Sequence, residues 1–180
     1  TIAAAERAGV TKTLCADPLP DDIDAALQTL LRRATEYIDR ELPSLPLVLF
    51  GTDSLTSLLI QNRLKYSSRE PAINVYTEGG EFLPHKDAQA LTVLLPLSHP
   101  GRDFAGGGTA FWHQDARGHR VEGPSLVRKP PGGTAMLFGG CVTHSGVSIE
   151  SGSRVVFVAS FSPETYAITT DQRDNYGDSM

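Results

Sequence analysis

The chain has 180 residues, of which 40% are hydrophobic and 21% are charged, and its net charge is −5 at pH 7. This composition is typical of a globular domain and excludes a disordered chain. The acidic balance argues against broad binding to nucleic acid or to an anionic membrane, and no apolar run approaches the ~20 residues of a membrane-spanning helix.

Two cysteines, Cys15 and Cys141, lie far apart without a C-x-x-C spacing. No disulfide framework is expected, which favours a reducing compartment. No signal-peptide pattern is visible, so a cytoplasmic location is the weak expectation. The chain does not begin with Met, and an upstream targeting segment is therefore compatible with it.

The first third of the chain has a helical pattern. In DDIDAALQTLLRRATEYIDREL, residues 21–42, apolar residues recur at steps of three and four and form one face of a helix. Asp21 or Asp22 is suited to cap its start, and Pro43 to end it. A second, shorter helix is expected after Asp53 or Ser54, through LTSLLIQNRL.

After Pro71 the pattern changes to short β-prone runs separated by Gly and Pro. These runs are AINVYTE, ALTVLLPL, GTAFWHQ, SLVRK, TAMLFGG, SGVSIE and SRVVFVASFS. Strands that follow helices predict the α+β class, as a jelly roll (a double-stranded β-helix barrel) backed by the N-terminal helices. We expect one domain, 1–180, with a helical support region at 1–70, a jelly-roll core at 71–163 and a polar tail at 164–180.

Two triplets have the form that places two metal ligands on one face of an extended segment. They are HKD, with His85 and Asp87, and HQD, with His113 and Asp115. Because side chains alternate along a strand, both triplets satisfy the geometry. Their context separates them, since HKD lies between apolar strand-like segments whereas HQD runs into the charged stretch ARGHRVEG, which predicts an exposed hairpin.

His144 is the expected third ligand. At about 8–12 residues for each strand and turn, the interval from His85 to His144 accommodates the several strands that separate facing ligands in a jelly roll, and the interval from His113 barely does. His85, Asp87 and His144 therefore form the better set. Two imidazoles and a carboxylate are the facial triad of non-haem Fe(II) oxygenases, and zinc accepts the same donors.

Arg154 begins the apolar run SRVVFVASFS. An arginine at the start of a strand that is buried on both faces has to reach an anion or the solvent edge. Its planar guanidinium can grip a carboxylate with two hydrogen bonds, as is needed to hold a dicarboxylic co-substrate; the alternative is an edge arginine paired with a local carboxylate.

With these segments in order, the sequence resembles the 2-oxoglutarate- and Fe(II)-dependent dioxygenases, and among them the prolyl 4-hydroxylase group. The resemblance covers roughly residues 72–162 and is carried by NVYTEGGEFLPHKD, LTVLLPLS, DFAGGGTAF, KPPGGTAMLF and THSGVSIESGSRVVFVASF. It implies that His85, Asp87 and His144 bind Fe(II), and that Arg154 pairs with the distal carboxylate of 2-oxoglutarate.

The resemblance also implies roles for residues around the triad. Tyr76 matches a tyrosine that contacts the co-substrate, and Thr92 matches a small polar residue that faces the site. Pro96 departs from the pattern, because many relatives have tyrosine there. The implied cofactors are Fe(II), with 2-oxoglutarate and O₂ as co-substrates and ascorbate as a reductant.

The implied reaction is hydroxylation of an unactivated C–H bond, with succinate and CO₂ as co-products. The first expectation for the substrate is proline in a peptide or protein, and the second is a free amino acid or another small molecule. A third hypothesis is a non-catalytic lectin-like or cupin-like jelly roll whose metal only binds a ligand. We expect no nucleic-acid or membrane partner, and the pattern does not indicate an oligomeric state.

The Gly-rich connection at 98–108 is a candidate contact for the substrate. Arg102, Asp103, Trp112 and the HQD residues are candidates for a binding rim. For Trp112 the alternative is packing in the core, and for Arg102 it is a solvated loop charge.

Overall fold

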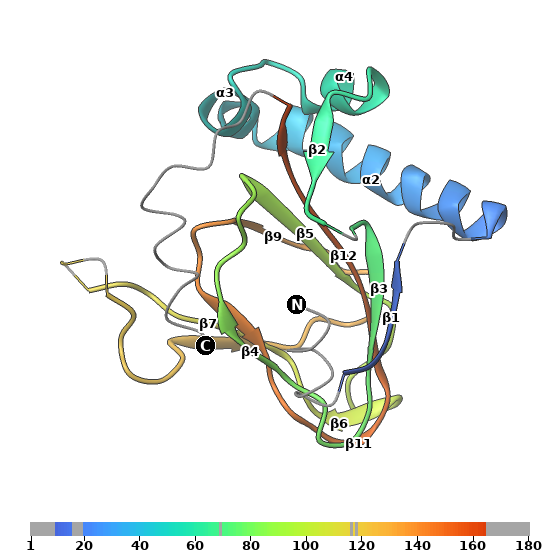
Figure 1. The fold of residues 1–180 in the computed structure, drawn as a ribbon, viewed down its shortest axis with the longest axis vertical. Helices are drawn as coiled ribbons and strands as arrows, with labels where there is room; N and C mark the ends of the chain where they lie inside the picture. Colours follow the sequence, from blue (N-terminus) through green and yellow to red (C-terminus); the bar gives the residue numbers. More distant parts are fainter. Residues whose placement is uncertain (1–9, 16–19, 69, 116, 118, 165–180) are drawn as a thin grey trace.

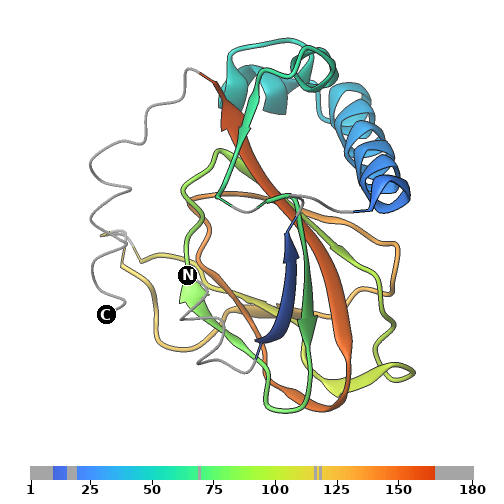
Figure 2. The same ribbon diagram turned by 45° about the vertical axis from the view of Figure 1, so that its right-hand side comes forward.

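A computed structural model describes residues 10–15, 20–68, 70–115, 117 and 119–164. The predicted polar tail at 164–180 lies outside this part of the chain except for Glu164. In Figures 1 and 2 three helices lie together on one side of a barrel of strands. All pairings between the named strands are antiparallel. The expected α+β fold, a jelly roll backed by helices, is confirmed.

The helices are α2 (Asp21–Glu41), α3 (Ser44–Phe50) and α4 (Leu55–Ile60). The apolar face predicted for α2 is the face that is buried, through Leu27, Leu31, Thr35 and Ile38. The predicted cap is wrong, because Pro20 is the N-cap and no side chain caps the helix start. The aspartates instead lie in the first turn, where their charge favours the positive end of the helix dipole.

The helix expected after Asp53 or Ser54 is confirmed as α4, although it ends at Ile60 and Leu64 begins β2. The Ser54 hydroxyl accepts a hydrogen bond from the Ser57 N–H. Helix α3 was not predicted, since its sequence SLPLVLF contains a proline. Pro46 is tolerated there because it lies in the first turn, where N–H groups have no partner within the helix.

Twelve strands follow the chain order β1 to β12 among the described residues. They are β1 (Val10–Cys15), β2 (Leu64–Tyr66), β3 (Ala72–Tyr76), β4 (Phe82–His85), β5 (Leu91–Pro96), β6 (Phe104–Gly106), β7 (Thr109–Phe111), β8 (Leu126–Arg128), β9 (Met136–Gly139), β10 (His144–Gly146), β11 (Ile149–Gly152) and β12 (Arg154–Pro163). They form a large sheet in the order β1-β3-β12-β5-β9 with β2 beside β12, a second sheet β4-β10-β7-β8, and the pair β11-β6.

Several strands differ from the prediction. Strands β1 and β2 lie within 1–70, which was expected to be helical, and both join the large sheet. Strands β4 and β6 are not among the β-prone runs of the prediction, because each is short and only partly apolar, although β4 is the strand-like segment that precedes HKD. The run SGVSIE divides into β10 and β11, since β10 pairs with β4 and β7 whereas β11 pairs with β6.

The two faces of the large sheet have different roles. Alternate residues of β5 and β12 pack against the helices; these are Leu91, Val93, Leu95, Phe157, Ala159 and Phe161. The intervening residues turn to the barrel interior, where Leu94, Arg154, Val156 and Val158 line a cavity. Because side chains alternate across a strand, strands buried on both faces position the wall of this cavity.

Candidate metal centre and co-substrate pocket

His85 and His144 face each other across two paired strands. His85 ends β4, His144 begins β10, and the two residues are register partners in the antiparallel ladder. Their ring centroids lie 4.3 Å apart. Residues directly opposite on neighbouring strands present their side chains on the same face, so the pairing brings the two imidazoles together.

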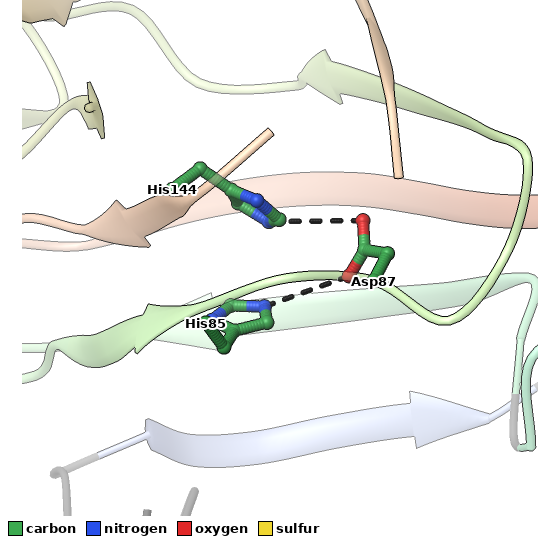
Figure 3. Close-up of side chains that lie close together, drawn as sticks. All are labelled: His85, Asp87 and His144. Atoms are coloured by element: carbon green, nitrogen blue, oxygen red, sulfur yellow. Dashed lines mark ion pairs between the residues drawn. The ribbon is translucent and has the colours of Figure 1, made fainter. Parts of the chain in front are cut away.

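Asp87 completes the group from the turn that follows β4 (Figure 3). Its Oδ1 lies 3.6 Å from Nε2 of His85, and its Oδ2 lies 3.8 Å from Nε2 of His144. The potential ligand atoms of all three residues lie within 4.8 Å of one another. Among the described residues this is the one group of three or more His, Cys, Asp or Glu side chains close enough to share a metal ion.

Both imidazoles are oriented by backbone carbonyls. The Nδ1 of His85 lies 2.8 Å from the Leu83 oxygen, and the Nδ1 of His144 lies 3.1 Å from the Val142 oxygen. A carbonyl only accepts hydrogen bonds, so in the neutral imidazole each Nδ1 carries the proton and each Nε2 presents a lone pair. This tautomer is the one in which both Nε2 atoms can bind a metal beside Asp87.

His144 is the most buried of the three, with 7% of its side chain exposed. Burial, and then the neighbouring His85, lowers the pKa of the His144 imidazole to about 4. The His144 imidazole is therefore neutral at pH 7, as a metal ligand has to be.

Two neighbours hold the Asp87 segment. The Thr92 hydroxyl, on fully buried β5, donates a hydrogen bond to Oδ2 of Asp87. Gly140 allows a close approach, since a Cβ atom there would lie 1.7 Å from the Gln89 carbonyl oxygen. Thr92 is not among the residues that line the cavity, so the contact that the structure gives it is to Asp87. Its role toward a co-substrate stays a prediction.

The alternative triplet HQD is engaged in its own hairpin. Asp115 accepts hydrogen bonds from the N–H groups of Arg117 and His119, which lower the pKa of its carboxyl. The Nδ1 of His113 contacts the Ser125 hydroxyl. These side chains are solvent-facing, and the geometry thus agrees with the exposed hairpin that the sequence predicts.

Arg154 is a buried cation at the other end of the cavity. It is 3% exposed, its Nη2 donates to the Thr109 hydroxyl at 2.9 Å, and its guanidinium lies 5.4 Å from the centre of the Tyr76 ring. No carboxylate of the described residues forms an ion pair with it. Burial lowers the pKa of Arg154, although a guanidinium keeps its charge in a protein. Most of its donors are therefore available to an anion.

A single cavity joins these groups. Its lining includes His85, Asp87 and His144 at the metal end, and Tyr76 and Arg154 at the other. A dicarboxylate that spans the cavity can place one end at the triad and the other on the guanidinium. Burial raises the pKa of the Tyr76 hydroxyl, so this group stays protonated and can donate a hydrogen bond.

The sequence did not point to two further residues of the cavity wall, Thr109 and Glu70. Thr109 binds Arg154 from β7. Glu70 precedes β3, and its carboxylate accepts hydrogen bonds from the N–H and hydroxyl of Ser160 on β12. No local pattern could have indicated Glu70, because SREPA has the composition of an exposed loop and the Ser160 contact is made far along the chain.

The predicted rim residues are partly engaged with one another. Arg102 donates two hydrogen bonds to Asp103, at 2.8 and 2.9 Å, and Asp103 also accepts from the His99 N–H. The half-buried Trp112 has the Arg120 guanidinium 5.5 Å from the centre of its ring. None of the predicted rim residues, Arg102, Asp103, Trp112 and the HQD residues, lines the cavity.

Comparison with known proteins gives partial matches to curated sequences. No family model matches the chain. It is 33% identical over 82 residues to the multifunctional procollagen lysine hydroxylase and glycosyltransferase LH3 of Rattus norvegicus, which covers 44% of this chain and 10% of that protein. It is 32% identical over 88 residues to procollagen-lysine,2-oxoglutarate 5-dioxygenase 1 of Mus musculus, covering 48% of this chain and 11% of that protein. The chain thus spans about a tenth of the length of these relatives.

Among solved structures, a viral hydroxylase matches over most of both chains. It is the viral collagen prolyl hydroxylase of Paramecium Bursaria Chlorella virus-1 in its 2-oxoglutarate complex, with a TM-score of 0.52 and 13% identity over 90% of this chain and 86% of that one. The resemblance to the 2-oxoglutarate- and Fe(II)-dependent dioxygenases is confirmed. At this level of identity the structural match shows a shared fold, and the activity is argued below. No helix in the described part of the chain is long and apolar enough to cross a membrane.

Proposed function

We propose that this protein is an Fe(II)- and 2-oxoglutarate-dependent hydroxylase that acts on an unactivated C–H bond of an amino-acid residue in a peptide or protein. The observation that carries the proposal is one cavity with a His-Asp-His group at one end and a buried guanidinium, with no carboxylate partner among the described residues, at the other. A metal ion at the His-Asp-His group would bind the oxo-acid end of 2-oxoglutarate, and the guanidinium would bind its far carboxylate. One co-substrate thus fits both ends of the cavity.

The donor set fits a ferrous ion. His85 and His144 would offer their Nε2 atoms and Asp87 one carboxylate oxygen, and such an ion would also be able to bind a co-substrate. With 2-oxoglutarate and O₂, such a centre supplies the oxidising chemistry for hydroxylation and yields succinate and CO₂. Ascorbate, as a reductant that restores Fe(II), belongs to the same proposal.

The other residues of the chain position these groups. Val142 and Leu83 fix the two imidazoles through their carbonyl oxygens, and Thr92 fixes Asp87. Arg154 would hold the distal carboxylate with a fork of two N–H groups, and Thr109 keeps the guanidinium in place. Apolar side chains of β5 and β12 line the wall between the two ends and exclude water from it.

Two residue types are candidates for the substrate. Proline is implied by the resemblance of the sequence to the prolyl 4-hydroxylase group. Lysine is suggested by the curated relatives, which are named as procollagen lysine hydroxylases. A free amino acid that undergoes the same chemistry is the alternative substrate.

The proposal is tested by anaerobic addition of Fe(II) and 2-oxoglutarate to the purified protein. We expect a weak visible charge-transfer band, and after admission of O₂ we expect succinate together with a gain of one oxygen atom in a substrate screen by mass spectrometry. The screen compares proline peptides, lysine peptides and free amino acids. Absence of the band in folded, iron-loaded protein would favour the non-catalytic binding module.

A further inference from the structure

Glu70 is a carboxylate at the metal end of the cavity that the proposed chemistry does not use. It is partly buried, lines the same cavity as the triad and Arg154, and is held by the N–H and hydroxyl of Ser160. No cation among the described residues forms an ion pair with it. Hydrogen bonds alone therefore compensate for its removal from water.

The register of the large sheet places Glu70 at the level of the triad. Ser160, which binds Glu70, is the register partner of Thr92, and Thr92 binds Asp87. Arg154 lies six residues before Ser160 on the same strand, which is about 20 Å at ~3.3 Å per residue. The cavity thus has Arg154 at one end, and at the other end Glu70 close to the metal ligands.

The charges of the loaded site leave Glu70 without a counter-charge. A ferrous ion and Arg154 supply three positive charges, and Asp87 together with a dianionic co-substrate supplies three negative ones. Glu70 adds a negative charge to a balanced, partly desolvated site. Consistent with this, burial and the nearby Asp87 raise the pKa of the Glu70 carboxyl to about 7, against the opposing effect of the Ser160 hydrogen bonds.

We infer that Glu70 binds a cationic nitrogen of the substrate beside the metal. An ammonium group there would complete the charge balance and replace lost hydration with a charge-assisted hydrogen bond. The inference rests on the proposed function and narrows its substrate class to compounds with a cationic nitrogen near the reacting carbon. A lysine side chain and the free amine of an amino acid both offer this group, whereas proline within a peptide does not.

The test uses pairs of probes that differ only in charge. Binding is measured by isothermal titration calorimetry to the anaerobic protein loaded with Fe(II) and 2-oxoglutarate, so that no turnover occurs. One pair is a blocked peptide with a central lysine and the same peptide with norleucine. The other is L-prolinamide and N-acetyl-L-prolinamide. The first pair represents a side-chain cation and the second a free amine.

We expect the cationic member of one pair to bind about 10- to 100-fold more tightly than its neutral partner, as is typical of a charge-assisted contact in a site withdrawn from water. The pair that shows the preference identifies the source of the cation. Glu70→Gln, which keeps size and a hydrogen-bond acceptor, should reduce the preference to less than about twofold. Ser160→Ala, which leaves the carboxylate in place, should retain it and is the matched control.

Three results would overturn the inference: no preference in either pair, no binding of either cationic probe, or an equal loss of affinity for both members of a pair in Glu70→Gln. The last would make Glu70 a structural residue. The charge-transfer band is recorded on the same wild-type samples. If the band is present and the preference absent, the role of Glu70 alone is wrong; if the band is absent, the proposed function itself fails.

Discussion

Substitution of Arg154 offers the sharpest test of the co-substrate pocket, because it should weaken 2-oxoglutarate binding without lowering the stability of the protein. Arg154→Met keeps a long, flexible side chain and removes the charge and the fork. If the guanidinium holds the distal carboxylate of 2-oxoglutarate, the loss of one partner of a buried charge pair costs ~2–5 kcal/mol. At ~1.4 kcal/mol for each factor of ten, this weakens 2-oxoglutarate binding by roughly 30- to 4,000-fold.

The same substitution should not destabilise the protein without its co-substrate. In that state Arg154 is 3% exposed with one hydrogen bond, to Thr109, and no carboxylate partner among the described residues. Replacing buried charges with apolar side chains of similar size is often neutral or stabilising, by up to ~4 kcal/mol. We therefore expect an unchanged or higher midpoint of urea unfolding.

The assay combines calorimetric titration of 2-oxoglutarate, on anaerobic Fe(II)-loaded protein, with urea unfolding of the metal-free protein. Arg154→Lys is the control that keeps the charge without the planar fork, and we expect an intermediate affinity. Unchanged 2-oxoglutarate affinity in Arg154→Met would refute the clamp. A large loss of stability with retained binding would show instead that the guanidinium supports the barrel.

The remaining predictions concern the metal and the neighbouring carboxylates. His85→Ala and Asp87→Ala should lose bound iron and turnover, whereas His113→Ala should keep the metal. If metal analysis showed iron lost from His113→Ala alone, HQD and not HKD would be the metal-binding triplet. Thr92→Val should weaken metal binding by about 10- to 100-fold in a metal titration, because it frees the Asp87 carboxylate, and an unchanged affinity would contradict that role. Glu70→Gln should stabilise the metal-free protein by ~3 kcal/mol at pH 8, since a carboxyl whose pKa rises from 4.5 to about 7 on folding contributes stability that is complete below pH 4.5 and lost as pH rises through 7. Urea unfolding should show this difference shrinking toward pH 4.5, and a difference that does not vary with pH would argue against it.

Local patterns were sufficient for the elements that carry most of the core. The three- and four-residue steps of residues 21–42 predict the buried face of α2, and the continuous apolar runs of β5 and β12 predict strands buried on both sides. The i, i+2 spacing of His85 and Asp87 places two potential ligands on one segment. These features depend on the periodicity of a helix or strand, which can be recognised from residues close together in the sequence.

Short strands and caps were harder to predict, since tertiary pairing outweighs weak local preference. Strand β4 has only four residues and is partly exposed, yet it is held by β10 through the His85–His144 register. The N-cap of α2 is Pro20 although two aspartates stand beside it. For β4 the partner that decides the conformation lies far away in the sequence.

The chemistry of the site shows the same division. Residue types, spacing and the context of the two triplets singled out His85, Asp87 and His144, and the family resemblance implied the role of Arg154. Closure of the barrel was needed to turn two imidazoles toward one carboxylate, to leave Arg154 buried without an acid among the described residues, and to bring Glu70 onto Ser160. The charge balance of the cavity depends on side chains from strands that are distant in sequence. These side chains come together only when the strands pack side by side.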